Sequence, residues 1–534
     1  MSTATTQAGV PAKLGAGPNP WVITVLVAFA SFMEVLDTTI ANVALPYVAG
    51  GMGVSADEAS WVVTTYLVSN AVILTASGFL AKRFGRKTFF ITCLILFTVS
   101  SVMCGFAPNL ETLLLFRILQ GLGGGGMVPV SQSIVADSFP PEKVGQGFAV
   151  WGIAVVVAPV VGPTLGGWIS DNFAWQWCFL INGPVGVIAI VLSSIILRES
   201  EAAAEERKRF QRDGNRFDIG GFVFVATFLG MLEVVLDRGL IEDWFASTFI
   251  VVISSLCALA FLLMIPWELS RRAPMIDIRM VATRQFSASL IVMLALGAIL
   301  LSTTQFVPQL VQQQLGYTAT WSGLVLSPGG LVTMIMMPIA GRLSTKVQPR
   351  YLIAIGAAAC AISMYQMSRL TPDIGFWFLA MNRLFLNAGI PLIFIPVTVA
   401  AYEGIPHEKT DQASSLINAA RNIGGSIGIS LANNALAHRE QFHQSRLVEL
   451  INPTTPQYQE TLKHVTDYFV SQGTSLLQAQ QQAVAWIGQQ IQTQAAFLSY
   501  IDVFWILMLV AVVAVPFALT LRTVKLGGPA PMGH

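Results

Sequence analysis

The sequence is poor in charge. Only 11% of its 534 residues are Asp, Glu, Lys or Arg, whereas soluble domains carry about 25%. Apolar residues make up 54%, and the mean hydropathy is +0.65. No soluble core explains such a deficit along an entire chain, but many apolar runs do, because about 20 residues of helix cross a bilayer core of ~30 Å. The scarcity of charge therefore predicts an all-α polytopic membrane protein.

Other scarcities exclude classes of function. A net charge of +1 gives no basic footprint for nucleic acid. The chain has no HExxH, GxSxG or P-loop sequence, so we expect neither an enzyme nor a cofactor. The five cysteines lie in apolar runs and the five histidines in loops or at the terminus, without the spacing of a metal site: Cys93, Cys104, Cys178, Cys257, Cys360, His407, His438, His443, His464 and His534.

Fourteen apolar runs are candidate membrane spans. The run at 410–437 is the weakest, because Ser, Asn, Gly and Arg421 interrupt it. Such a helix must face protein or a wet cavity, where its polar groups find partners. The runs are 21–46, 58–80, 88–107, 111–137, 144–169, 176–197, 217–236, 244–266, 286–312, 321–343, 350–370, 375–403, 410–437 and 497–521.

Loop charge gives an orientation. Clusters of Lys and Arg occupy alternate loops, such as 82–87, 198–216 and 271–284, and Arg238 is the exception among the short opposite loops. This is the positive-inside pattern, and it places both termini in the cytoplasm. The polar tail 1–20 runs into the first apolar run without a cleavage-site pattern, so we expect that run to be retained.

The chain contains an internal repeat. RILQGLGGGGMVPV, which starts at Arg117, aligns with RLFLNAGIPLIFIPV, which starts at Arg383. The same offset of 266 residues joins Pro140 to Pro406, Glu142 to Glu408, Lys143 to Lys409, Gln146 to Gln412 and Gly162 to Gly428. Both copies fall on the same membrane side, which predicts two parallel six-helix halves around a central site.

The repeat divides the chain into five parts. These are a cytoplasmic tail (1–20), an N-terminal half (21–197), linkers with two inserted helices (198–284), a C-terminal half (285–521) and a second tail (522–534). The C-terminal half includes a Gln-rich external loop, 438–496, whose flanks have helical periodicity. This loop is either a solvated surface hairpin or a docking site for a periplasmic partner.

Several motifs resemble the major facilitator superfamily, and specifically its fourteen-span drug:proton antiporters. They are LDTTIANVALP (Leu36–Pro46), GFLAKRFGRK (from Gly78), LFRILQGLGGGG (Leu115–Gly126) and GIAVVVAPVVGPTLGG (Gly152–Gly167). LDRGLIEDWF, GYTATWSGL and the long external loop resemble the EmrB-type multidrug exporters. One position departs, because Lys82 stands where many relatives carry Asp, which puts the usual charge relay of that loop in doubt.

The resemblance implies a major facilitator fold with two inserted helices, in the cell inner membrane among its lipids. It also implies proton-coupled antiport of hydrophobic or amphipathic drugs, with a periplasmic adaptor (membrane fusion) protein and an outer-membrane channel as partners. The alternative substrate is one endogenous metabolite, such as a siderophore. An intramembrane enzyme or sensor and an uncoupled channel are disfavoured by the absent motifs and by the repeat.

Charges inside the apolar runs are the sharpest functional signal, because a charge at the bilayer centre costs at least ~2.5–3.5 kcal/mol. Glu34 and Asp37 lie three residues apart on the first helix. Helix rise places Asp37 and Arg117 at comparable depths, so the two can pair. We expect Asp37, Arg117 and Glu34 to couple proton movement to transport; the alternative is a fixed structural ion pair.

Further candidates are weaker. Arg421 either neutralises a carboxylate or binds an anionic substrate, Arg383 is expected in a structural pair, and Glu233 is expected in solvent near a membrane end. Residues expected to line a cavity are Asn70, Gln132, Gln305, Phe306, Gln309 and Asn387. Residues expected in gating motifs, or alternatively in turns and close packing, are Gly78, Gly85, Arg86, Gly152, Gly162, Pro163, Gly166 and Gly167, with a bend expected at Pro163.

Overall fold

The computed structural model describes residues 18–140, 143–199, 204–205, 207–208, 212, 218–271, 274–406, 409–451 and 454–523, and these form helices without a strand. The predicted tails, except for residues 18–20 and 522–523, lie outside these residues. So do most of the basic linker 200–217, His407 and His534, and the repeat pair Glu142 and Glu408.

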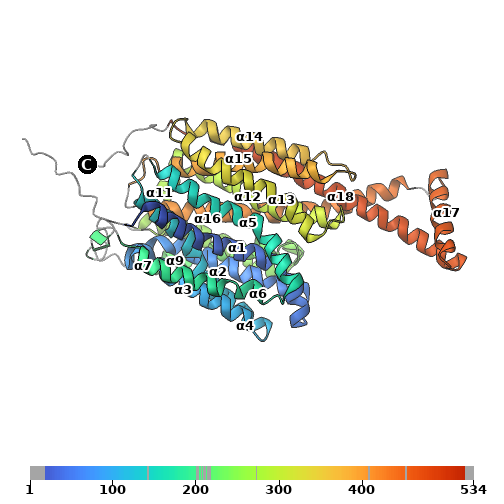
Figure 1. The fold of residues 1–534 in the computed structure, drawn as a ribbon, viewed down its shortest axis with the longest axis horizontal. Coiled ribbons are helices and arrows are strands. Elements are labelled where there is room, and N and C mark those ends of the chain that lie inside the picture. Colours follow the sequence, from blue (N-terminus) through green and yellow to red (C-terminus); the bar gives the residue numbers. More distant parts are fainter. Residues whose placement is uncertain are drawn as a thin grey trace, which may run out of the picture.

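The helices form two bundles and an inserted pair (Figure 1). The first bundle contains α1 (Pro20–Met52), α2 (Ala56–Phe84), α3 (Arg86–Gly105), α4 (Leu110–Ser138), α5 (Val144–Asn172), α6 (Trp177–Leu180) and α7 (Asn182–Ile196). The inserted pair is α9 (Ile219–Arg238) and α10 (Thr248–Ser270), with the short η1 (Trp244–Ala246) between them. After α11 (Ile278–Val281), the second bundle contains α12 (Arg284–Gln313), α13 (Ala319–Leu343), α14 (Pro349–Met367), α15 (Phe376–Tyr402), α16 (Thr410–Leu450), α17 (Pro456–Ser471) and α18 (Leu476–Leu519).

Local sequence fixes where these helices begin and end. Ser55 and Glu58 form a capping box at the start of α2, in which each side chain accepts from the other residue's backbone N–H. Asn109 caps α4 through its side chain. Gly53 ends α1 with φ +68°, a left-handed conformation that favours glycine.

Eleven helices among the described residues are long and apolar enough to cross a membrane, or twelve if the bent α5 counts as one span. The fourteen predicted spans are therefore not confirmed. The two long helices outside this set are α14 and α16. As expected for a polar helix, α16 packs against protein: it contacts α2, α4, α9, α12 and α18.

The two ends of the bundle differ. In Figure 1, α17 projects beyond the bundle on the extensions of α16 and α18, and we call this the α17 end. The opposite end, here the basic end, holds the turn between α2 and α3 with Arg83 and Arg86. The predicted span at 497–521 begins much earlier as a helix, since α18 starts at Leu476. The helical flanks expected for the external loop are thus present.

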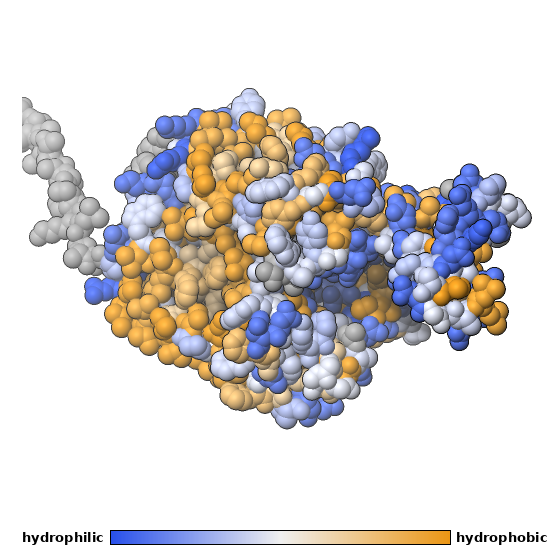
Figure 2. All heavy atoms as spheres, turned by 45° about the vertical axis from the view of Figure 1, so that its right-hand side comes forward, coloured by the Kyte–Doolittle hydropathy of each residue, from blue (hydrophilic) through white to orange (hydrophobic). Residues whose placement is uncertain are grey.

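The outer surface carries a broad apolar band. Figure 2 shows hydrophobic residues over the flank of the bundle and hydrophilic residues toward both ends. Exposed members include Val187 and Ile195 on α7 and Leu259 and Leu262 on α10. A surface this apolar is unsuited to water, and together with the eleven or twelve spans it identifies a multi-pass membrane protein.

The inserted pair docks at the seam between the two bundles. Helix α9 contacts α2 of the first bundle and α16 of the second. Buried Leu229 belongs to a small apolar cluster that includes Ala71 of α2 and Ile423 of α16. Helix α10 covers the outside of α9 and is itself largely exposed. The pair therefore closes one side of the interface between the halves.

Candidate substrate cavity and buried charge network

A cavity of about 550 Å³ lies between the two bundles. Its wall comes from α1, α2, α4 and α5 on one side and α12, α13 and α16 on the other, with α9 at the seam. The lining reaches Pro46 and Gln312, close to the α17 ends of α1 and α12. Figure 2 shows the surface hollowed between the bundles on that side. The volume fits a drug-sized molecule.

The cavity is closed toward the basic end by contacts between the bundles. Ser77 of α2 lies 2.9 Å from Ser415 of α16, oxygen to oxygen. Arg86 donates from Nε and Nη2 to both carboxylate oxygens of Asp411, each at 3.1 Å, and also pairs with Asp137 of α4. Such charge-assisted contacts hold the halves together at this end.

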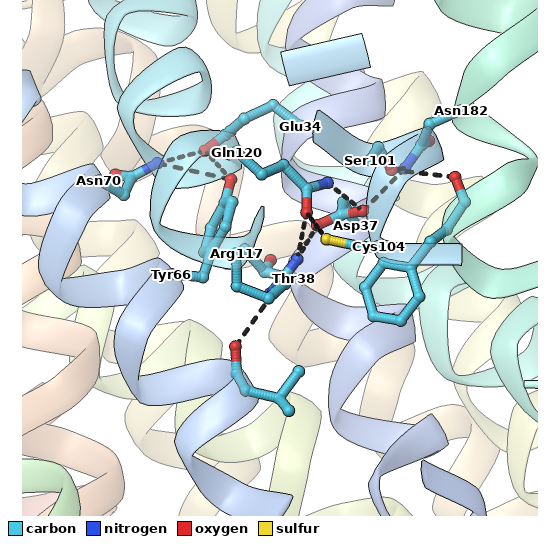
Figure 3. Close-up of polar contacts among 12 residues, drawn as sticks. Glu34, Asp37, Thr38, Tyr66, Asn70, Ser101, Cys104, Arg117, Gln120 and Asn182 are labelled. Carbon is cyan, nitrogen blue, oxygen red and sulfur yellow. Dashed lines mark hydrogen bonds and ion pairs between the residues drawn. The ribbon is translucent and has the colours of Figure 1, made fainter. Parts of the chain in front are cut away.

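Asp37 and Arg117 form a fully buried ion pair in the first bundle (Figure 3). Arg117 Nη1 lies 2.7 Å from Asp37 Oδ2. The other carboxylate oxygen accepts hydrogen bonds from Gln120 at 2.9 Å and Asn182 at 2.7 Å. Arg117 also donates through Nε to the carbonyl of Val62. A buried charge requires such partners, and both members of this pair have them.

Glu34 faces the cavity, whereas Asp37 does not. Glu34 Oε1 accepts from the Tyr66 hydroxyl at 3.2 Å and from Asn70 Nδ2 at 2.9 Å. The guanidinium of Arg117 lies 4.2 Å from the centre of the Tyr66 ring, a cation–π contact. Tyr66 therefore contacts Glu34 through its hydroxyl and Arg117 through its ring, and so connects the cavity wall with the buried ion pair (Figure 3).

A glycine run makes this arrangement possible. Gly121 and Gly125 of α4 face α2, where an added Cβ on Gly125 would collide with the backbone oxygen of Asn70. Helices α2 and α4 therefore approach backbone to backbone. This close approach places Tyr66 and Asn70 beside Glu34.

Two more charges line the cavity, Arg421 and Glu233. Arg421 is buried, donates to Asn422 at 3.3 Å, and interacts electrostatically with Glu34. The prediction that Glu233 lies in solvent near a membrane end is wrong. Because α9 packs into the seam rather than beside the bundle, Glu233 is only 6% exposed and accepts a hydrogen bond from Ser426 at 2.7 Å.

Arg383 lacks its expected pair. Its side chain is buried in α15, and Nε and Nη1 have no hydrogen-bond partner in the described part of the chain. No ion pair reaches it within the same residues. The sequence explains the difference from Arg117, because α12, which matches α1 in the repeat, contains no Asp or Glu.

Three of the six expected cavity residues line it, Asn70, Gln305 and Gln309. Gln132 does not, because it is fully buried between α4 and α16, where its side-chain oxygen accepts from Ser414 at 2.8 Å and Asn418 at 2.7 Å. Phe306 points into the core of the second bundle. It follows Gln305 directly, and neighbouring side chains of a helix point about 100° apart, so the two face different surroundings. Asn387 packs against Gly329 inside the same bundle.

The residues predicted for gating lie at helix contacts. Gly85 has φ +91°, which requires glycine in the turn before α3. Gly78 faces the backbone of Asp411, and Gly152 faces Met337 and Phe394 of the second bundle. Gly162 and Gly166 pack on α1 at Thr39 and Ile40, and Gly167 is buried.

The bend of α5 lies one turn from its expected position. The helix turns by 43° between Pro159 and Val161 rather than at Pro163. Pro163 has no N–H to donate to the carbonyl of Pro159, four residues earlier. The helical hydrogen bond is therefore missing at Pro159, where the bend begins. Both Pro159 and Pro163 line the cavity.

Several partners in the network were not anticipated. Gln120, Asn182 and Tyr66 hold the buried pair and Glu34, yet none was among the predicted site residues. Gln120 and Asn182 interrupt apolar runs, which is the signal that could have singled them out. Tyr66 carries no such signal, because tyrosine is common at many helix contacts.

The chain resembles known transport proteins over nearly its entire length. A profile described as Major Facilitator Superfamily matches residues 27–429. The chain is 36% identical to "Multidrug export protein EmrB" of Escherichia coli (strain K12), over 91% of this chain and 92% of that protein. It is 34% identical to "Fatty acid resistance protein FarB" of Neisseria gonorrhoeae, over 85% and 88% respectively.

A solved structure shares the fold. The proton:xylose symporter XylE superposes with a TM-score of 0.58 at 15% identity, covering 95% of this chain and 97% of that one. The resemblance to EmrB-type exporters is confirmed by the identity over nine-tenths of the chain. With the matched profile and this fold, the chain belongs to the major facilitator superfamily.

Proposed function

We propose that this protein is a proton-coupled antiporter that exports hydrophobic or amphipathic drugs across the inner membrane, with both termini in the cytoplasm. The observation that carries the proposal is the polar chain from the cavity to a buried ion pair: Glu34, Tyr66, Arg117 and Asp37. The names of relatives support drug export, since two of them are "Multidrug export protein EmrB" and "Probable multidrug resistance protein EmrY".

The polar chain offers a route from proton binding to conformational change. Glu34 meets any water in the cavity, which extends toward the proposed external side. A proton on Glu34 removes a negative charge from the cavity wall, which also carries Arg421. A proton on Asp37 cancels the charge that holds Arg117. Either event changes which helices attract one another, as coupling requires.

Closure at the basic end supports alternating access. With the basic end taken as cytoplasmic, the contacts of Arg86 with Asp411 and of Ser77 with Ser415 seal the cavity from the cytoplasm. Opening to the cytoplasm must break them, so they act as a latch for the outward-facing state. Lys82 replaces the acidic residue of this loop, and Asp411 supplies the carboxylate from the opposite half instead.

The α17 end supports assembly with a periplasmic adaptor and, through it, an outer-membrane channel. The helical extensions and α17 project beyond the bundle (Figure 1) and expose large apolar side chains such as Tyr468, Leu476, Leu477 and Trp486. Large apolar side chains are unfavourable on a hairpin that is exposed only to water, so their exposure favours contact with a partner protein. Deleting part of 438–496 should abolish adaptor cross-linking while membrane insertion persists.

Export of one dedicated metabolite is the less favoured alternative, because the Escherichia coli relative is named a multidrug export protein. Proteoliposomes with an imposed pH gradient test the proposal against a panel of lipophilic dyes, drugs and siderophores. Gradient-driven transport of several unrelated compounds is expected. Transport of a single metabolite alone would favour the alternative, and no dependence on the gradient would refute antiport.

A further inference from the structure

The inserted helix α9 contributes a carboxylate to the cavity. Leu229 and Glu233, one helical turn apart, both line it, and Leu229 is held by the apolar cluster between α2 and α16. This packing directs the Glu233 side chain through the seam toward Ser426 on α16. The inserted pair is therefore part of the binding surface as well as a cover over the interface.

Glu233 lacks a cation. Its single hydrogen bond comes from the neutral hydroxyl of Ser426, and no ion pair reaches it within the described residues. The charged group acting on it is Asp237, a like charge one turn away. A buried carboxylate with one neutral donor is incompletely compensated, and a positive group placed beside it would restore the balance.

The other two charged residues of the cavity wall, Glu34 and Arg421, have opposite signs. Arg421 and Glu34 interact electrostatically, and Glu34 also accepts from Tyr66 and Asn70. With two carboxylates and one cation among the described residues of the wall, the cavity has one acidic group in excess, and Glu233 is the carboxylate without a cation beside it. Much of the cavity wall is apolar, including Val63, Leu67 and Leu300, and suits the hydrophobic body of an amphipathic molecule.

We propose that Glu233 binds the positively charged group of lipophilic cations in this cavity, which makes the inserted helix a determinant of substrate charge. This inference rests on the proposed export function and narrows its substrate class. It separates this chain from any exporter of anions such as fatty acids, because a carboxylate facing the ligand repels another carboxylate.

Binding of two matched ions tests the proposal. Tetraphenylphosphonium and tetraphenylborate have nearly the same shape and opposite charge, and triphenylphosphine oxide is a neutral relative. Equilibrium binding to the full-length protein in lipid nanodiscs is measured for wild type, Glu233→Gln and Asp237→Asn. Asp237 is the control, because it lies on the same helix and bonds to Thr64 but does not line the cavity.

Wild type should bind the cation at least tenfold more tightly than the borate. Glu233→Gln should weaken cation binding roughly tenfold, in line with one charge pair in a partly hydrated site, while binding of the neutral oxide stays within twofold and shows that the cavity is intact. Asp237→Asn removes a charge that acts on Glu233 only from a distance, so its binding of all three should stay much closer to wild type than that of Glu233→Gln. Equal or tighter borate binding by wild type would overturn the proposal without any variant.

Unchanged cation binding in Glu233→Gln would overturn it as well. Because the assay needs no gradient, it is independent of coupling. If the cation binds through Glu233 but is not moved by a pH gradient in liposomes, the binding site stands and the proposed antiport fails. If the cation is transported equally by wild type and Glu233→Gln, antiport stands and the role of Glu233 fails.

Discussion

Substitution of Asp37 by Asn should separate the structural cost of the buried pair from its role in coupling. Both charged side chains are almost fully buried, at 0% and 1% exposure. Asn keeps the shape and can still accept from Gln120 and Asn182. It replaces the oxygen that faces Arg117 with an NH₂ group, so two donors meet and the cation is left uncompensated.

The size of the effect follows from these contacts. Removing one member of a buried ion pair costs about 3–5 kcal/mol. Arg117 keeps two acceptors, the carbonyls of Val62 and Gln120, so we expect a loss near the lower limit, about 3 kcal/mol. Glu34→Gln should cost less than Asp37→Asn, because the two groups that donate hydrogen bonds to Glu34 are neutral and remain bonded, and only the more distant interaction with Arg421 is lost.

A double variant distinguishes the two roles. Asp37→Asn with Arg117→Gln removes both charges and should recover a large part of the stability, measured by thermal unfolding in detergent. It should still lack substrate transport driven by a pH gradient, because no ionisable pair remains. Wild-type gradient-driven transport in the double variant would refute coupling through this pair and leave a fixed structural pair.

Three further predictions concern the ends and the packing of the halves. Cysteines at Ser77 and Ser415 should cross-link and block transport until reduced, given the 2.9 Å between the native hydroxyls; transport undiminished by cross-linking would contradict the latch. Gly125→Ala should destabilise the protein by about 1–3 kcal/mol, because the added methyl meets the backbone of α2; an unchanged unfolding temperature would argue against this close packing. Burial acts to raise the pKa of Asp277, but Lys409 and backbone N–H groups outweigh it and hold the pKa below its ordinary value of 3.8. The contribution of Asp277 to stability is then present above that value and lost as the pH falls through the lowered pKa, so Asp277→Asn should be less stable than wild type at pH 7 and converge with it in acid. A stability difference between wild type and Asp277→Asn that grows as the pH falls would contradict this prediction.

The sequence was sufficient for the fold and for the buried pair. Hydropathy and the 266-residue repeat define the helices, and helix rise put Asp37 and Arg117 at one depth, where the structure shows them 2.7 Å apart. Depth is predictable because it depends only on position along a helix. Whether this pair couples transport stays a prediction.

Helix rotation and inter-helix docking were not predictable in the same way. Phe306 and Gln305 are neighbours in sequence, yet one faces the core and the other the cavity. Glu233 looked solvated because it lies near the end of the predicted run 217–236, whereas α9 continues to Arg238 and packs into the seam. Both depend on contacts between distant segments, which a single sequence does not specify.

Antiport requires that substrate movement in one direction drives protons in the other, and this exchange can be measured. Proteoliposomes loaded with a pH indicator and given no imposed gradient receive a transported dye on one side. Wild type should move protons in the direction opposite to the dye, in proportion to dye transported, and Asp37→Asn with Arg117→Gln should not. Dye movement by wild type without proton movement would rule out proton-coupled antiport.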